Sequence, residues 1–149
     1  MNIEKDVSNL AFKLINTLDI DAYEDAPTGK LVILDPKTQA PTDSHIILAS
    51  PEHESRKRLD FARTRQLRQE FSATGKMAVA DPLDEYDEAT DYLVAATLGW
   101  NLTQAGAPLE FSPAAARKLY VDPKKQWLRA QALAGIRKTE LFIESSAKA

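Results

Sequence analysis

The chain contains 149 residues, of which 44% are hydrophobic and 28% are charged, and its net charge is -3 at neutral pH. These values are typical of a soluble globular protein that can bury a core without covalent staples. The absence of cysteine excludes disulfides, thiolate metal sites and a cysteine nucleophile. The first residues show no signal-peptide pattern, and no apolar run approaches the length of a membrane span, so we expect a cytoplasmic protein.

Charge is distributed unevenly along the chain. Residues 77–111 contain seven acidic residues and neither Lys nor Arg, whereas residues 51–76 have seven basic against four acidic residues. Residues 112–149 have eight basic against three acidic residues. Two interpretations stay open: the blocks complement each other where neighbouring helices pack, or one block faces a charged partner.

The first 50 residues predict a short helix followed by a β-hairpin. Apolar residues recur at helical spacing over 7–18. Residues 31–34 and 45–48 are compact, branched apolar runs, bounded by turn-forming residues, which is typical of strands. The segment between them contains two prolines, so we interpret it as a hairpin loop and Asp35-Pro36 as a turn. Because a lone hairpin is marginally stable in water, we expect its apolar face to pack on helices or on another protein.

Helices are predicted for most of the remaining chain. Four sites combine a helix-capping side chain with a proline suited to the first turn: Ser50-Pro51, Asp81-Pro82, Ser112-Pro113 and Asp122-Pro123. From these starts we expect helices over 50–71, 83–102 and 123–143, a loop at 106–111 and a further helical segment after Ser112.

The predicted fold class is therefore mainly α with a small β-hairpin (α+β). In this prediction the N-terminal hairpin packs on a core of three to four helices. We expect a helix and hairpin region at residues 1–50 and a helical domain at residues 51–149, which together form one compact unit.

The sequence shows no pattern typical of a catalytic or metal site. His45 and His53 have no metal-ligand motif around them. The acidic residues that begin the helix over 83–102 suit the helix dipole and lack the glycine turn of a calcium loop. No Gly-x-Ser-x-Gly motif and no glycine-rich phosphate loop occurs. We therefore expect no enzymatic activity, no metal and no cofactor.

The helix over 50–71 carries a row of arginines. A basic face of this kind can bind nucleic acid by releasing counterions from phosphates. Against this interpretation, the whole chain is acidic and no aromatic residues are interleaved for base stacking. We favour a solvated or protein-facing helix and do not expect nucleic acid as a partner. The alternative basic face consists of Arg56, Arg58, Arg63, Arg65 and Arg68.

A series of short motifs in the second half of the chain resembles a known family. The motifs are Leu98-Gly99-Trp100 within residues 92–101, Gly106-Ala107-Pro108-Leu109-Glu110-Phe111-Ser112, Leu119-Tyr120, Trp127-Leu128-Arg129 and Phe142. Their order and spacing resemble the C-terminal part of tailed-bacteriophage tail assembly chaperones. The hairpin, with its tip at residues 35–38, and the arginine-containing helix are also similar to that family, so the resemblance covers most of residues 20–145. Residues 121–125 look inserted relative to the family pattern, and Ala114-Ala115 replaces more polar residues.

The resemblance implies a small non-enzymatic protein that binds the long, largely helical tape-measure protein and assists tail-tube polymerisation around it. Its partners would be the tape-measure protein and the tail-tube protein. It would act in the cytoplasm of the bacterial host, without a membrane, and be absent from the mature virion. Some relatives self-associate, so a homo-oligomer is also compatible with the resemblance.

Aromatic residues at predicted helix ends provide a candidate binding site, although residues of this type can also fill a core. We expect the client protein to contact a groove between the helices over 83–102 and 123–143, formed by Leu98, Trp100, Phe111, Trp127, Leu128 and Ile136. Two other functions stay open: a structural tail or neck adaptor that is retained in the virion, and a small nucleic-acid-binding regulator that uses the basic face.

Overall fold

The computed structural model of the chain describes residues 16–77 and 81–146. The chain divides into two compact units, one comprising Met1–Asp25 and Ile143–Ala149 and the other Ala26–Phe142. The boundary expected between residues 50 and 51 falls inside the second unit. Most of the helix expected over 7–18 lies outside the described residues.

The first unit contains a small antiparallel ladder. Strand β1 (Tyr23–Asp25) pairs with β7 (Ile143–Ser145), and Tyr23 lies opposite Ser145. The Ser146 N–H extends the ladder by donating to the Ala22 carbonyl, 2.9 Å away. This pairing joins two segments that are far apart in the sequence. It was not predicted, because the sequence analysis assigned residue 143 to the end of a helix.

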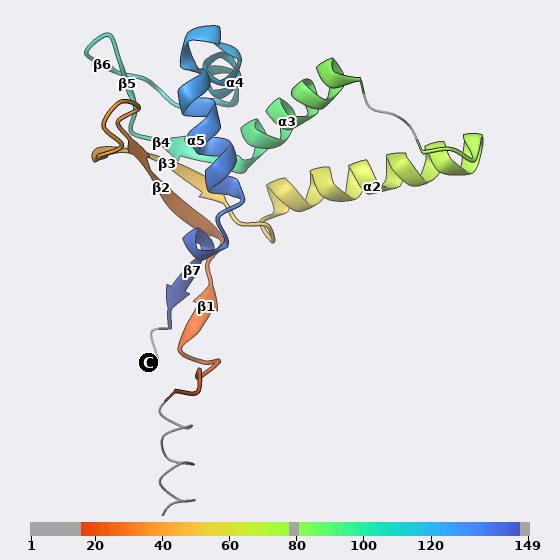
Figure 1. Cartoon of the computed structure of the whole chain (residues 1–149), viewed down its shortest axis with the longest axis horizontal. Coiled ribbons are helices and arrows are strands. Elements are labelled where there is room, and N and C mark those ends of the chain that lie inside the picture. Colours follow the sequence, from red (N-terminus) through yellow and green to blue (C-terminus); the bar gives the residue numbers. More distant parts are fainter. Residues whose placement is uncertain (1–15, 78–80, 147–149) are drawn as a thin grey trace, which may run out of the picture. The chain divides into compact units, whose positions relative to one another are not determined.

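The second unit is built on a three-stranded antiparallel sheet in the order β2-β3-β4 (Figure 1). Strands β2 (Thr28–Leu34) and β3 (Pro41–Ala49) form the predicted hairpin, which is confirmed and longer than expected. At its tip the Asp35 carboxylate accepts the backbone N–H groups of Lys37 and Thr38, so the predicted turn at Asp35-Pro36 is also confirmed. These two bonds stabilise the ionised carboxylate and lower the pKa of Asp35.

The third strand corrects the predicted fold class. Helix α3 covers Pro82–Ala96, and the chain then becomes strand β4 (Thr97–Trp100), which pairs with β3. A helix over 83–102 was therefore wrong at its C-terminal end. Residues 97–100 were assigned to the helix from the spacing of their apolar side chains alone. In so short a segment, the same spacing fits either a helix or a strand. Trp100 lies opposite Ile46, so pairing with the hairpin decides the conformation.

The mainly α prediction is wrong for the same reason. The part of the chain that the structure describes contains four α-helices and seven strands in three small sheets, which is an α+β fold. The third sheet is a two-stranded hairpin of β5 (Thr103–Gln104) and β6 (Ala107–Pro108), of which β6 lies within the loop predicted at 106–111 and β5 precedes it. Its turn places Ala105 at φ 53° and Gly106 at φ 80°, a conformation that favours glycine.

The remaining helices begin close to the predicted capping sites. Helix α2 (Glu54–Thr74) begins after His53, later than Ser50-Pro51 predicts, and ends at Gly75 with φ 68°. The Ser50 N–H instead donates to the Pro27 carbonyl. Helix α4 (Pro113–Val121) is capped by Ser112.

The segment predicted as a helix over 123–143 is broken into several elements. A 3₁₀ turn, η1 (Pro123–Lys125), begins after Asp122 and leads into helix α5 (Gln126–Ile136). A second 3₁₀ turn, η2 (Thr139–Phe142), precedes β7. The predicted start is confirmed, whereas the predicted end was too late because the chain leaves the helix to reach β7.

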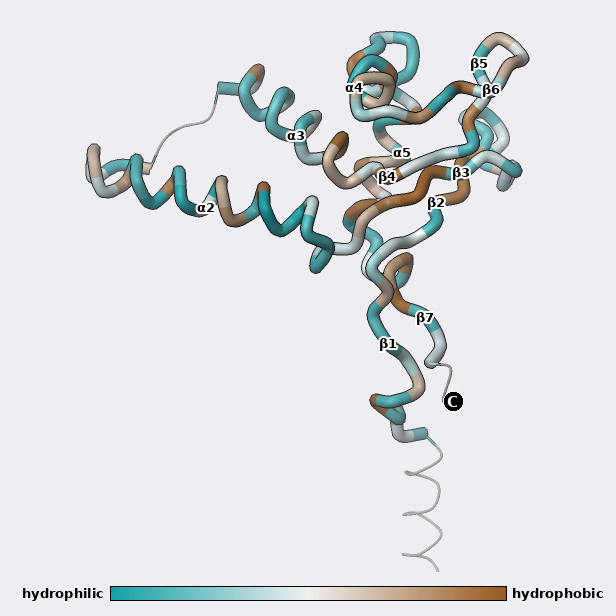
Figure 2. The backbone as a smooth tube through the Cα atoms, turned by 180° about the vertical axis from the view of Figure 1, so that it is seen from behind, coloured by the Kyte–Doolittle hydropathy of each residue, from teal (hydrophilic) through white to brown (hydrophobic). Residues whose placement is uncertain are grey.

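Helix α5 packs against β2 and β3, and α3 and α4 pack against α5. The core between them consists of Ile33, Ile46, Leu48, Leu93, Ala96, Leu102, Ala116, Tyr120, Leu128, Ala132, Ile136 and Phe142. Figure 2 shows hydrophobic residues concentrated along β3 and mostly hydrophilic residues along α2. Among the described residues, none of the helices is long and apolar enough to span a bilayer.

Candidate binding groove

The predicted client-binding residues are distributed between the core and its rim. Leu128 and Ile136 are buried within the core, at 4% and 6% exposure. Trp100 and Phe111 are half-buried and pack on each other edge to face, with ring centroids 4.9 Å apart. The Trp100 indole N–H also donates to the Leu109 carbonyl at 2.8 Å. These contacts give four of the six residues a role in holding the fold together.

The other two predicted residues are more accessible. Trp127 is 40% exposed at the start of α5 and lies outside the core, and Leu98 is half-buried in β4. The structure therefore brings Trp100 and Phe111 together but leaves the six residues without one shared open surface. Of the six predicted residues, only Ile136 lines the groove that is described below.

The five arginines of the alternative basic face fall into two groups. Arg58, Arg63, Arg65 and Arg68 are exposed on α2. Arg56 is 6% exposed, and its guanidinium is turned into the protein. One arginine of the predicted row is therefore part of the interior and cannot contribute to a surface patch.

Arg56, near the N-terminus of α2, forms hydrogen bonds to three other elements of the fold. Its Nη1 donates to the Ala49 carbonyl at 3.0 Å and its Nη2 to the Ile136 carbonyl at 3.1 Å. Its Nε donates to the Tyr92 hydroxyl at 2.9 Å, and that hydroxyl donates to Asp60 at 3.4 Å. The guanidinium also lies 5.3 Å from the Tyr92 ring centroid. A single side chain thus fixes α2 to β3, α3 and α5.

A second buried arginine joins α5 to α3. Arg129 is 5% exposed, donates to the Thr90 hydroxyl at 2.7 Å and to the Tyr86 carbonyl at 3.3 Å, and stacks 3.9 Å from the Tyr86 ring centroid. Within residues 16–77 and 81–146, no ion pair with a carboxylate involves either Arg56 or Arg129. Both buried cations are instead held by neutral oxygens and aromatic rings.

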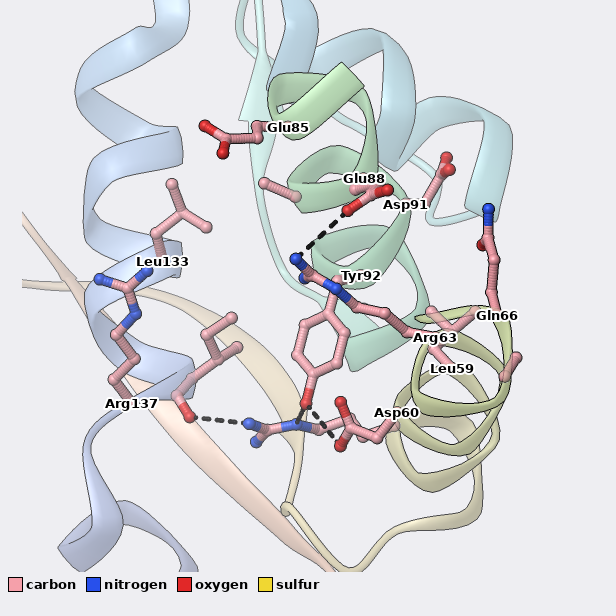
Figure 3. A pocket seen from close by; sticks show the side chains of 14 residues that line it. Leu59, Asp60, Arg63, Gln66, Glu85, Glu88, Asp91, Tyr92, Leu133 and Arg137 are labelled. Atoms are coloured by element: carbon pink, nitrogen blue, oxygen red, sulfur yellow. Dashed lines mark hydrogen bonds and ion pairs between the residues drawn. The ribbon is translucent and has the colours of Figure 1, made fainter. Parts of the chain in front are cut away.

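A groove of about 610 Å³ lies between α2, α3 and α5. Figure 3 shows Tyr92 pointing from α3 into this space, with Leu133 of α5 and Arg137, which follows α5, on one side and Arg63 of α2 on the other. Apolar side chains come from all three helices, and they are Leu59 and Ala62 on α2, Ala89 and Tyr92 on α3, and Leu133 and Ile136 on α5. The groove therefore has an apolar lining, and the hydrogen bonds of Arg56 fix the three helices around it.

The groove carries charged side chains of both signs. Glu85, Glu88 and Asp91 line the α3 side, the α2 side carries Arg63 together with Asp60, and Arg137 follows the end of α5. One ion pair crosses between α2 and α3, with Arg63 Nη2 3.5 Å from Glu88 Oε2. Both partners of this pair are about half exposed, so the pair adds little to stability, and both charges can be shared with a bound molecule.

A buried hydroxyl pair lies away from the groove, in the core. The Tyr120 and Thr97 hydroxyl oxygens are 2.8 Å apart, and the Thr97 hydroxyl also contacts the Leu93 carbonyl. Burial disfavours the phenolate and raises the pKa of Tyr120 to about 12. This pair joins α4 to the junction of α3 and β4, where the predicted helix changes into a strand.

Sequence reasoning predicted a groove between the helices over 83–102 and 123–143 but placed other residues in it, and of the six predicted residues only Ile136 lines the groove between α2, α3 and α5. No motif marks Leu59, Ala62 or Leu133 in the sequence, and Tyr92 belongs only to the family-like series that begins at residue 92. The available signal was the acidic helix following a basic one, which predicts adjacent walls of opposite charge. In the described ranges, no group of three or more His, Asp or Glu side chains is arranged to hold a metal ion. No protein-family model, curated protein or solved structure matches this chain.

Proposed function

We propose that this protein is a non-catalytic tail assembly chaperone that binds a helical segment of a phage tape-measure protein. The groove between α2, α3 and α5 is the observation that carries the proposal, because its apolar lining and its charged side chains of both signs suit an amphipathic helix. The family-like motif series over residues 92–142 adds the identity of the client. In this role the protein also assists polymerisation of the tail-tube protein, acts in the host cytoplasm and leaves before the virion is complete.

The walls of the groove suggest how a client helix is oriented. Leu59, Tyr92 and Leu133 accept the apolar stripe of the client. The acidic α3 wall attracts Lys or Arg on one flank of the client helix, and Arg63 and Arg137 attract Asp or Glu on other flanks. The binding energy comes mainly from the apolar contacts, whereas the charges fix the orientation.

Co-expression with the tape-measure protein of the same phage genome tests this proposal. Ala62 lines the groove and is exposed, so Ala62→Trp fills the binding space without disturbing the core. Ala130 is an exposed helical alanine that does not line the groove, which makes Ala130→Trp a matched control. We expect Ala62→Trp to reduce recovery of the tape-measure protein about tenfold or more, and Ala130→Trp to leave it unchanged. Equal recovery with both variants would contradict the groove as the binding site.

The virion provides a separate test of the chaperone role. Mass spectrometry of purified particles should detect the tape-measure and tail-tube proteins without this chain. Its presence at stoichiometric amounts would instead support an adaptor that remains in the tail or neck.

A further inference from the structure

Helix α2 is attached to the rest of its unit near its N-terminus. Of its 21 residues only Arg56 is buried, and that side chain donates to β3, α3 and α5. Residues 64–74 form what we call the distal half of α2. Within residues 16–77 and 81–146, no hydrogen bond or ion pair joins this half to another helix or strand. In Figures 1 and 2 the distal half extends away from the sheet.

One ion pair holds α2 against α3 where the distal half begins. Arg63 Nη2 lies 3.5 Å from Glu88 Oε2, and Figure 3 shows this pair reaching from α2 to α3. Arg63 follows Arg56 by about two helical turns, and Glu88 precedes Tyr92, to which Arg56 donates, by about one turn. The ion pair is therefore a second attachment, farther along both helices than the contact of Arg56. Both of its side chains are about half exposed, so it breaks and re-forms readily.

The groove is lined by the part of α2 between these two attachments. Leu59 and Ala62 lie between Arg56 and Arg63 in the sequence, and both line the groove. Leu59 is half-buried and Ala62 is exposed. An outward movement of α2 therefore removes little apolar surface from contact, and its main cost is the loss of the ion pair.

The C-terminal end of α2 also permits such a movement. Gly75 ends the helix at φ 68°, and no atom lies within 4 Å of the position that a Cβ would take there. Residues 75–81 connect α2 to the start of α3, and a chain of that length spans up to about 23 Å. The connection is therefore long enough to let the two helices separate.

We propose that α2 is a lid on the groove, with a hinge near Arg56 and a latch formed by Arg63 and Glu88. In the closed state the latch joins α2 to α3. In the open state the latch is broken, Arg56 keeps its hydrogen bonds, and the groove is wider. The lid rests on the proposed function for the identity of the client, because a client helix enters through the open state. The movement itself belongs to the free protein and is measured without a client.

Distances between two spin labels test the movement. The chain contains no cysteine, so Gln69→Cys on the distal half of α2 and Ala130→Cys on α5 place one label on each helix, both at exposed positions. Double electron–electron resonance should show a closed and a more distant population in the free protein. Arg63→Met/Glu88→Gln removes the latch without changing the net charge. It should raise the ratio of open to closed molecules about two- to fivefold, as expected for an exposed ion pair.

Two controls accompany this measurement. Arg58→Met/Glu54→Gln removes an exposed ion pair that lies within α2, also without changing the net charge, and should leave the distances unchanged. Labels at Ala114→Cys on α4 and Ala130→Cys on α5 should show one narrow distance, with or without the latch, because α4 and α5 pack together in the core.

A covalent latch tests whether the client needs the movement. Arg63→Cys/Glu88→Cys is treated with a short bifunctional maleimide, which bridges α2 and α3, or with a monofunctional maleimide, which modifies both positions without a bridge. The probe is the purified tape-measure segment that co-expression recovers. We expect the bridged protein to bind this segment about tenfold or more weakly than the protein with two separate modifications.

Three results would overturn the lid. One narrow distance between positions 69 and 130, identical in the wild-type protein and the latch variant, would show that α2 does not move. A broad distribution that the latch variant leaves unchanged would exclude Arg63 and Glu88 as the latch. Equal binding by the bridged and unbridged proteins would show that a client enters without the movement. If neither modified protein nor the wild type binds the segment, the proposed function fails, and the spin-label distances alone decide whether α2 moves.

Discussion

The two halves of α2 differ sharply although their sequences look alike. Both halves are rich in arginine with few apolar residues, yet the N-terminal half is fixed to three other elements and the distal half contacts solvent. The difference depends on Arg56, which finds two backbone carbonyls and a tyrosine hydroxyl within hydrogen-bond distance. Arg65 and Arg68 lie where no such acceptors are available from the core of the same chain.

This comparison shows that a row of arginines on one helix is not a single functional surface. A buried guanidinium with satisfied donors holds the fold together, because its removal leaves acceptors without partners. An exposed guanidinium contributes little to stability and is available for a binding partner. Stability and association should therefore respond to different arginines of the same helix.

The largest effect on stability is expected for Arg56→Met, which removes the hydrogen bonds between the N-terminal part of α2 and β3, α3 and α5. The substitution leaves the Ala49 and Ile136 carbonyls and the Tyr92 hydroxyl without their donor, and we expect a loss of about 3–5 kcal/mol in the free energy of unfolding. Arg58→Met, at an exposed position two residues away, should change this free energy by about 0.5 kcal/mol or less. Urea denaturation measures both. Equal effects of the two variants would remove the distinction between them.

A further loss of stability is expected when a methyl group is added to a tightly packed glycine. A Cβ at Gly29 would lie 2.6 Å from the Leu141 carbonyl oxygen, a backbone atom that cannot move aside easily. We therefore expect Gly29→Ala to cost about 2 kcal/mol. Gly99 has no atom within 4 Å of the same position, so Gly99→Ala should be neutral or slightly stabilising. Thermal denaturation that ranks these variants in the opposite order would contradict the packing of η2 on β2.

The Tyr120 hydroxyl should make stability depend on pH in alkaline solution. Its pKa is raised from about 10 in the unfolded chain to about 12 in the folded protein. The folded state thus keeps a proton that the unfolded state loses, so this contribution is intact below pH 10 and is lost as the pH rises toward 12. Over that interval the wild-type protein should lose about 2–3 kcal/mol more than Tyr120→Phe. If the unfolding free energies of the two proteins fell in parallel as the pH rises, titration of Tyr120 would not be the cause of the pH dependence.

The smallest effect on stability is expected in the distal half of α2. Because Leu67 and Phe71 are exposed in a single chain, Leu67→Ser/Phe71→Ser should change the unfolding free energy of the monomer by about 0.5 kcal/mol or less. The measurement is urea denaturation at a concentration where the wild-type chain is monomeric. A loss of several kcal/mol there would mean that the distal half packs within its own chain.

The sequence predicted the local features of the fold better than its long-range pairings. The hairpin turn at Asp35-Pro36 and the caps at Asp81, Ser112 and Asp122 depend on neighbouring residues, and they were recognisable from the printed sequence. The pairing of Trp100 with Ile46 depends on residues far apart in the sequence. Apolar spacing over 97–100 could not reveal that pairing, and the fold class was wrong as a result.

The candidate site was less predictable than the fold. Burial of Arg56 and Arg129 depends on carbonyls and aromatic rings from other elements, so no local pattern separates these arginines from the exposed ones. The six predicted client-binding residues were chosen as aromatic or apolar positions near helix ends, and most of them fill the core or its rim. The acidic character of α3 was visible in the sequence, and its Glu85, Glu88 and Asp91 line one wall of the groove, whereas the α2 wall carries both Arg63 and Asp60.

The most direct test of the account is photo-crosslinking within a complex of this protein and the tape-measure protein. A benzophenone amino acid is placed either at position 62, inside the groove, or at position 130, outside it. We predict that irradiation links position 62 to one helical segment of the tape-measure protein and leaves position 130 unlinked. Crosslinks from position 130 alone, in a complex that forms normally, would contradict a client helix in the groove between α2, α3 and α5.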